Sequence, residues 1–215
     1  MIGLFGGTFD PVHFGHLRPA LEVLEALALE EVRFVPARVP PHRVVPAAAA
    51  EDRLRMLELA LEGVRGFRVD RRELERDGPS YTVDTLRSLR GEVGDRPLVL
   101  IMGTDAFSGL AQWHRWTELI GLAHIAVACR PGATAPQTGP LAEWTTTRRV
   151  DAPSDLRGTP AGRMLFVEVT QLEIAATDIR ARVARGASPR YLLPQDVADY
   201  IKARGLYCNA GDGAG

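Results

Sequence analysis

Short runs of apolar residues alternate along this chain with segments whose apolar positions repeat at helical spacing. Leu17, Leu21 and Leu24 lie four and three residues apart, a spacing that predicts an amphipathic helix. Six apolar runs predict strands instead, at residues 1–5, 32–36, 67–70, 98–102, 124–129 and 165–169. These runs lack a clean apolar–polar alternation, which is typical of parallel strands covered by helices on both faces. The pattern therefore predicts an α/β fold with a doubly wound, mostly parallel sheet, whose ligand crevice lies at the carboxyl ends of the strands.

After residue 130 the pattern becomes less regular. Residues 130–162 are rich in Pro, Gly, Thr and Ala, which predicts a long connection or a weakly structured excursion. Two helices then close the fold, one over residues 177–186 and one over 194–204, with Gly205 as the stop signal of the second. Because no linker divides the chain, we expect a single domain over residues 1–208 and a disordered tail over 209–215.

Composition and charge narrow the class of protein. The chain has 215 residues, with 26 basic and 27 acidic side chains and a formal net charge of −1. This balance argues against a nucleic-acid partner and against a basic membrane-binding patch. Cys129 and Cys208 lie in unrelated contexts, so neither a disulfide framework nor a cysteine zinc site is indicated. No apolar run approaches the ~18 residues of a membrane span, and the N-terminus begins as a strand, so we expect a soluble cytoplasmic enzyme.

The connection from the first strand to the first helix, residues 6–16, carries the clearest chemical signal, and we call it the histidine turn. Gly6 and Gly7 let the backbone approach a ligand and expose N–H groups, and the helix start behind them favours an anion. His13 and His16, three residues apart at a helix start, can present both imidazoles to one ligand. The turn predicts a phosphate site with two neutral-to-cationic donors.

Other interpretations of the histidine turn were weighed against this one. Either pair alone also fits a tight turn with capping or surface histidines. A metal site would need further ligands nearby, and Asp10 has a simpler role in fixing the turn, so we predict no protein-held metal. The spacing also differs from the dinucleotide-binding GxGxxG motif and from the Walker loop.

A second phosphate element follows the last predicted strand. Thr177 is a good N-cap residue, and Asp178 suits the first turn of a helix. Arg180 opposes the helix dipole there, which makes sense where an anion shares the site with the guanidinium group. The alternative is a solvated arginine at small cost in free energy. Together with the histidine turn, Arg180 predicts a polyphosphate clamp.

At these residues the chain resembles the nucleotidyltransferase superfamily that carries an HxGH signature and a C-terminal (S/T)xxR helix start. Within it, the sequence is similar to the bacterial nicotinate-nucleotide adenylyltransferases. The matching stretches follow one another through most of the chain, at residues 6–16, 39–43, 53–57, 79–86, 103–105, 112–114, 130–132, 191–194 and 200–201. The resemblance implies a Rossmann-like nucleotidyltransferase fold with ATP and nicotinate mononucleotide as its partners.

The resemblance also implies roles for the matched positions. The residues at the ATP phosphates would be Gly6, Gly7, Thr8, Phe9, His13 and His16. The adenosine ribose would meet Gly103 and Asp105, and the adenine side and polyphosphate would meet Thr177, Ile179 and Arg180. The mononucleotide phosphate would bind Arg43 and His42, and the nicotinate ring would lie among Tyr81, Thr82 and Trp113. The implied catalytic residues are His16, as the main donor to the transition state, with His13 and Arg180.

The implied reaction is attack by the mononucleotide phosphate on the α-phosphorus of ATP, with Mg²⁺ carried by the nucleotide. Because a phosphate nucleophile is already ionised at neutral pH, catalysis would come from positioning and charge stabilisation. Two departures from the family pattern stand out. Ala175 and Ala176 occupy positions where hydroxyl residues are usual, and His114 stands where a tyrosine is frequent.

Several alternatives remain open at the level of sequence. The same chemistry could act on nicotinamide mononucleotide or phosphopantetheine, or transfer a cytidylyl group. A nucleotide-binding regulator that has lost catalysis is a further alternative, and Ala175 and Ala176 give it slight support. The oligomeric state is open as well, a homo-oligomer included.

Overall fold

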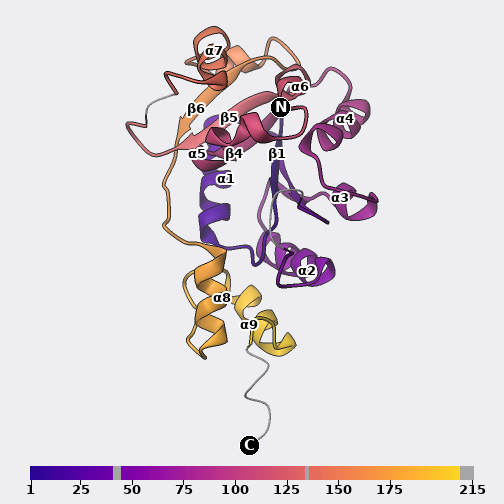
Figure 1. Cartoon of the computed structure of the whole chain (residues 1–215), viewed down its shortest axis with the longest axis vertical. Coiled ribbons are helices and arrows are strands. Elements are labelled where there is room, and N and C mark those ends of the chain that lie inside the picture. The colour runs from indigo at the N-terminus through magenta and orange to yellow at the C-terminus, as the bar shows by residue number, and fades with distance from the viewer. Residues whose placement is uncertain (41–44, 134–135, 209–215) are drawn as a thin grey trace, which may run out of the picture.

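The structure, a computed structural model, describes residues 1–40, 45–133 and 136–208. Its centre is a sheet of six parallel strands in the order β3-β2-β1-β4-β5-β6 (Figure 1). The strands are β1 (Ile2–Gly7), β2 (Glu31–Pro36), β3 (Phe67–Val69), β4 (Leu98–Gly103), β5 (His124–Cys129) and β6 (Met164–Glu168). The predicted doubly wound sheet is confirmed, and each strand lies within two residues of its expected bounds.

Helices cover both faces of this sheet (Figure 1). They are α1 (Phe14–Ala26), α2 (Ala50–Leu61), α3 (Arg72–Glu75), α4 (Thr82–Val93), α5 (Thr104–Ser108), α6 (Trp116–Leu122), α7 (Pro140–Thr147), α8 (Ala176–Ala184) and α9 (Gln195–Arg204). Two 3₁₀ turns, η1 (Leu110–Gln112) and η2 (Pro153–Leu156), complete the described elements. Among the described residues, no helix is long and apolar enough to cross a membrane.

Two hydrophobic cores lie on opposite faces of the sheet. Because successive residues of a strand point to opposite faces, β4 contributes to both cores. Val99 and Ile101 pack with buried residues of α1, α2, α8 and α9. Leu98, Leu100 and Met102 pack with residues of α4, α5, α6 and α7. Burial on both faces explains why the strands are continuous apolar runs.

The strand order places a crevice between β1 and β4. From β1 the chain adds β2 and β3 on one side of the sheet, and after α4 it returns to place β4 on the other side of β1. At such a switch point the connections leave the carboxyl ends of neighbouring strands in opposite directions and open a crevice. The histidine turn after β1 and the start of α5 after β4 therefore meet at this edge.

Residues 130–162 are more ordered than the sequence analysis expected. The stretch predicted as a long connection contains α7 and η2. Leu141 and Trp144, three residues apart on α7, are 5% and 8% exposed and belong to one of the two cores. Pro140 begins this helix, a position that proline favours, and a short helix amid Thr and Gly leaves only a weak pattern.

The two closing helices are found with one correction. Helix α9 ends at Arg204, and its C-cap is Gly205, whose φ of +60° is the left-handed conformation expected of a helix stop. Helix α8 begins at Ala176, and its N-cap is Ala175, with an extended backbone (φ −112°, ψ 139°) and no side-chain cap bond. The prediction of Thr177 as N-cap was wrong, because the chain enters the helix before it reaches the hydroxyl. The predicted tail, 209–215, lies outside the described residues.

Candidate active site

The first half of the histidine turn is a backbone loop closed over a buried ring. Phe9 has a positive φ of 50°, and its side chain is only 1% exposed. Gly7 lies against this ring, since a Cβ atom at position 7 would stand 2.8 Å from Cζ of Phe9. A side chain at Gly7 would push the ring away. Phe9 can therefore offer a phosphate its backbone N–H but not its side chain.

The two histidine rings lie against each other at the start of α1, tilted by about a third of a right angle. His13 has an extended backbone (φ −152°, ψ 171°), and its N–H donates to Nδ1 of His16 at 3.3 Å. The ring centroids are 3.8 Å apart, with 34° between the planes. Gly15 permits this arrangement, because a Cβ there would stand 2.9 Å from Nδ1 of His13 and 3.1 Å from the carbonyl oxygen of Ile174. The glycine between the histidines is thus a requirement of their packing.

Burial fixes the charge of His13. Its side chain is 5% exposed, and desolvation by burial lowers its pKa to about 4. The ring is therefore neutral at pH 7, which lies within the neutral-to-cationic range expected of the two donors. Within the described residues its Nδ1 is buried with no hydrogen-bond partner, an arrangement typical of a site that a ligand completes.

The hydrogen bond between the histidines also assigns the proton on His16. Its Nδ1 accepts the His13 N–H, so a neutral ring carries its proton on Nε2. The ring of His16 lies beside two aromatic rings of the turn, with centroids 5.2 Å from Phe9 and 6.4 Å from Phe5. His16 is thus a fixed Nε2–H donor next to Phe5.

Helix α8 brings Arg180 to the histidine turn. Its Nη1 donates to the carbonyl oxygen of Asp10 at 2.6 Å and lies 3.8 Å from Oδ2 of the same residue. Asp10 therefore supplies part of the negative charge beside Arg180, which the sequence predicted to come from a ligand.

The other two predicted residues of α8 differ in exposure. Thr177 is exposed, whereas Ile179 is 0% exposed and belongs to the core, so only the backbone of Ile179 can face a nucleotide.

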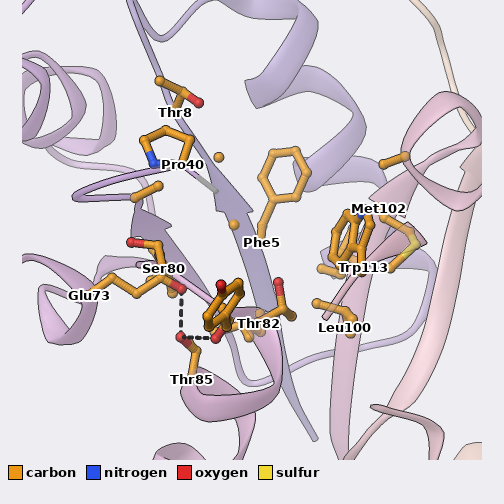
Figure 2. Close-up of a pocket in the computed structure, with 18 of the residues that line it drawn as sticks. Phe5, Thr8, Pro40, Glu73, Ser80, Thr82, Thr85, Leu100, Met102 and Trp113 are labelled. Carbon is orange, nitrogen blue, oxygen red and sulfur yellow. Dashed lines mark hydrogen bonds between the residues drawn. The ribbon is translucent and has the colours of Figure 1, made fainter. Parts of the chain in front are cut away.

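A cavity of about 420 Å³ opens between the carboxyl ends of β1 and β4 and the start of α4 (Figure 2). It is lined by eight of the predicted site residues, Gly6, Gly7, Thr8, Tyr81, Thr82, Gly103, Asp105 and Trp113. Predicted phosphate-binding and ring-binding residues thus share one space. The other described site residues, Phe9, His13, His16, Thr177, Ile179 and Arg180, do not line it. His16 reaches its edge through Phe5, which does.

One side of the cavity is aromatic, and we call Tyr81, Trp113 and His114 the aromatic wall. The rings of Tyr81 and His114 stack, with centroids 4.2 Å apart and 28° between the planes. All three residues line the cavity, and α4 begins at Thr82 directly after Tyr81. A flat ring bearing an anionic group would meet both a stacking surface and the positive end of a helix dipole here.

Two predicted residues, His42 and Arg43, lie outside the described residues. Their neighbour Pro40 lines the cavity, so the chain approaches this site immediately before them. Within the described part of the chain, no group of three or more His, Cys, Asp and Glu side chains could hold a metal ion.

The structure also adds cavity residues that the sequence analysis missed. Among them are Pro40, Glu73, Ser80, Thr85 and Gln112. Ser80 and Thr85 belong to the matched stretch 79–86, and Thr85 follows Tyr81 by one helical turn, a spacing that could have indicated a shared face. Glu73 lies on the four-residue helix α3, where no periodicity marks a buried position.

Three comparisons place this geometry among known proteins. A cytidylyltransferase-like family model matches residues 4–182. Two similar proteins, from Methylococcus capsulatus and Aeromonas hydrophila, are 52% and 48% identical, over 96% of this chain and 99% and 96% of their own. Both are named probable nicotinate-nucleotide adenylyltransferase.

A solved structure shares the fold at low sequence identity. It is the Plasmodium falciparum nicotinic acid mononucleotide adenylyltransferase complexed with NaAD. The match has a TM-score of 0.69 and 14% identity, and it covers 96% of each chain. At this sequence identity the likeness supports only the fold, whereas the family assignment rests on the two bacterial relatives above.

Proposed function

This chain belongs to the nicotinate-nucleotide adenylyltransferases of the cytidylyltransferase-like family, and on that premise we propose that it transfers the adenylyl group of ATP to nicotinate mononucleotide. The products are nicotinate adenine dinucleotide and pyrophosphate, a step of NAD biosynthesis. One observation carries the proposal. The histidine turn and the aromatic wall flank a single cavity at the carboxyl ends of β1 and β4, so two nucleotides can meet there.

The transfer needs positioning more than acid–base chemistry. A phosphate oxygen of the mononucleotide forms a bond to the α-phosphorus of ATP. The bond from that phosphorus to its bridging oxygen breaks, and pyrophosphate leaves with the electron pair. The attacking oxygen is ionised at neutral pH and needs no base, so catalysis comes from alignment and from donors aimed at the developing charge.

In this proposal the histidine turn holds the triphosphate. Backbone N–H groups of residues 6–9 face the phosphates, and the Nε2–H of His16 donates to the α-phosphate as its charge rises. The neutral ring of His13 helps to hold the β- and γ-phosphates. Arg180, already held beside Asp10, adds the fixed positive charge, and Gly103 and Asp105 meet the ribose.

The mononucleotide occupies the side of the cavity nearer to α4. Its pyridine ring stacks within the aromatic wall, and its carboxylate accepts from backbone N–H groups in the first turn of α4, beginning at Thr82. Its phosphate binds Arg43 and His42, which follow Pro40 in the chain.

ATP enters as its Mg²⁺ complex, because phosphate oxygens and water suit this ion without an all-protein cage. Neutralising the triphosphate in this way reduces the repulsion between two polyanionic substrates. We assign the reaction to the cytoplasm, and a homo-oligomer is compatible with it.

The deciding experiment measures pyrophosphate release with ATP and Mg²⁺, comparing nicotinate mononucleotide with its amide at equal concentrations. A strong preference for the acid supports the proposal and a carboxylate-selective pocket beside Tyr81, Thr82 and Trp113. A preference for the amide would retain the mechanism and reassign the substrate. No release with either, despite ATP binding, would indicate another acceptor or a regulator.

A further inference from the structure

A buried carboxylic acid lies in the wall of the cavity, where an anionic substrate is expected. Glu73, on the short helix α3, is 7% exposed and lines the cavity (Figure 2). An unpaired carboxylate in this position would oppose the binding of a phosphate or a nicotinate ring. The hydrogen bonds of Glu73 therefore determine how much negative charge it presents to the cavity.

Two hydroxyl groups lie beside Glu73. Thr85 donates from Oγ1 to Oε1 of Glu73 at 2.6 Å, and the Ser80 hydroxyl lies close enough to the carboxylate to lower its pKa. Burial raises the pKa of Glu73, whereas the two hydroxyls and the charge of Arg76 lower it. Glu73 is thus surrounded by donors and adds little bare charge to the cavity.

A hydroxyl that gives its one proton to Glu73, as Thr85 does, keeps its oxygen as an acceptor. The oxygen of Thr85 accepts a hydrogen bond from Nη2 of Arg76 at 3.2 Å. The oxygen of Ser80 accepts the backbone N–H of Arg38 at 3.0 Å. The two hydroxyl groups beside Glu73 are therefore each held by a further N–H donor, one of them from a different segment of the chain.

These bonds reach both sides of the cavity. We call residues 37–40, which follow β2, the strap. Ser80 holds the strap twice, through the Arg38 N–H and by donating its own N–H to the carbonyl oxygen of Val39 at 3.0 Å. Thr85 lies one turn into α4, directly beneath Tyr81, whose carbonyl oxygen is 3.3 Å from the same hydroxyl. Ala37 and Pro40 of the strap line the cavity, as do Tyr81 and Thr82.

We propose that Glu73 is a positioning residue for the acceptor nucleotide, which orients the strap and the start of α4 through Ser80 and Thr85 and so shapes the mononucleotide half of the site. The inference rests on the proposed function, because it assumes that the acceptor occupies this cavity. Glu73 touches no reacting atom. It acts on acceptor binding, whereas the histidine turn acts on ATP.

The test compares Glu73→Gln with Glu75→Gln, the same change at an exposed site on the same helix. The amide removes the negative charge that Thr85 and Arg76 face and leaves one acceptor oxygen in place of two. We expect Glu73→Gln to raise KM for nicotinate mononucleotide by about tenfold to a hundredfold, the effect of a buried hydrogen bond to a charged group. KM for ATP should change by less than about threefold, and Glu75→Gln should behave as wild type.

A second variant covers the case in which Glu73→Gln does not fold. Thr85→Val removes one donor at nearly constant volume and should shift KM for the mononucleotide in the same direction. Equal rises in both KM values, or unchanged kinetics in both variants, would overturn the role of Glu73. A wild-type protein that releases no pyrophosphate with either mononucleotide would instead overturn the proposed function, so the two failures are distinguishable.

Discussion

At the scale of single residues, the proposed chemistry depends most on His16. Its Nδ1 is occupied by the His13 N–H, so Nε2 is the nitrogen that can donate to a phosphate. We expect His16→Ala to lower kcat by about a hundredfold or more, as removal of one preorganised donor typically does. Stability should fall by about 1 kcal/mol, because the substitution also removes a helix-capping contact. Steady-state kinetics and a thermal melt test both statements, and a near-normal kcat would contradict the assignment.

His13 should make stability depend on pH. Its folded pKa of about 4 lies below the ordinary value of 6.5, so between these values the unfolded chain binds the proton and the folded chain does not. Stability is therefore full above pH 6.5 and decreases as pH falls toward 4. For one such group the loss at pH 5 is about 2 kcal/mol relative to pH 7.

The measurement is urea unfolding at pH 7 and pH 5 for the wild type and for His13→Asn. Burial also lowers the pKa of His124, so the wild-type decrease contains contributions from both histidines. The variant should show a smaller decrease than wild type by about 2 kcal/mol. Equal decreases in the two proteins would mean that His13 is accessible to protons in the folded state.

Local spacing predicted the histidine pair, since residues three apart at a helix start must lie close together. It could not predict that His13 is buried and neutral, because distant segments pack against this helix start: the carbonyl oxygen of Ile174 lies beside Gly15, and that of Leu192 accepts the N–H of Phe14. The same reason applies to Phe9 and Ile179, whose side chains enter a core that the sequence does not place.

At the scale of elements, one buried arginine ties α2 to the site. Arg53 is 1% exposed and donates to three carbonyl oxygens, of Thr8 at 2.8 Å, Ala48 at 3.3 Å and Arg38 at 3.4 Å. These carbonyls belong to the histidine turn, the start of α2 and the strap. The cation thus joins the two segments that flank the cavity near Thr8.

Replacing Arg53 should be costly, and Arg55 provides a matched control two residues away. We expect Arg53→Met to lower the unfolding free energy by about 2–4 kcal/mol, because it leaves buried carbonyl oxygens unpaired. The side chain of Arg55 is 54% exposed and meets Glu58 at 3.5 Å, so Arg55→Met should cost less than about 1 kcal/mol. Urea denaturation measures both, and equal losses would contradict the role of Arg53.

The elements were predicted where their pattern is strong and missed where it is weak. Strands buried on both faces are apolar runs that stand out against polar loops, and all six were found. Helix α7 was missed because only Leu141 and Trp144 mark its buried face. The start of α8 was misplaced because a hydroxyl favours an N-cap only where the backbone is already extended, and here that residue is Ala175.

At the scale of the molecule, the C-terminal end of the described chain returns to the histidine turn. Tyr207 follows α9 and donates from its hydroxyl to Oδ1 of Asp10 at 2.7 Å. Burial and the Asp10 charge raise the pKa of Tyr207 far above its ordinary value, so the hydroxyl keeps its proton. Asp10 also accepts the N–H groups of Ala47 and Ala48 and lies beside Arg180. Parallel-sheet topology follows from pattern and handedness rules, but a contact across 197 positions leaves no periodic signal.

This long-range contact predicts a coupling between the C-terminal segment and ATP binding, for which Tyr200 supplies a control. The Tyr200 hydroxyl donates to Oδ1 of Asp52 at 2.8 Å, a similar bond between α9 and α2 that does not involve the histidine turn. Tyr207→Phe and Tyr200→Phe should each lower the unfolding free energy by about 1–3 kcal/mol.

Only Tyr207→Phe should raise KM for ATP, by about threefold to tenfold, because a less constrained Asp10 no longer fixes Arg180. KM for the mononucleotide should stay constant in both variants, since the tyrosine hydroxyls donate to Asp10 and Asp52 and not to the aromatic wall or the strap. Initial-rate kinetics with each substrate varied in turn, together with urea unfolding, separate the two effects. If both variants raise KM for ATP equally, the effect reflects general loosening of α9. If neither does, the histidine turn holds its shape without the C-terminal segment.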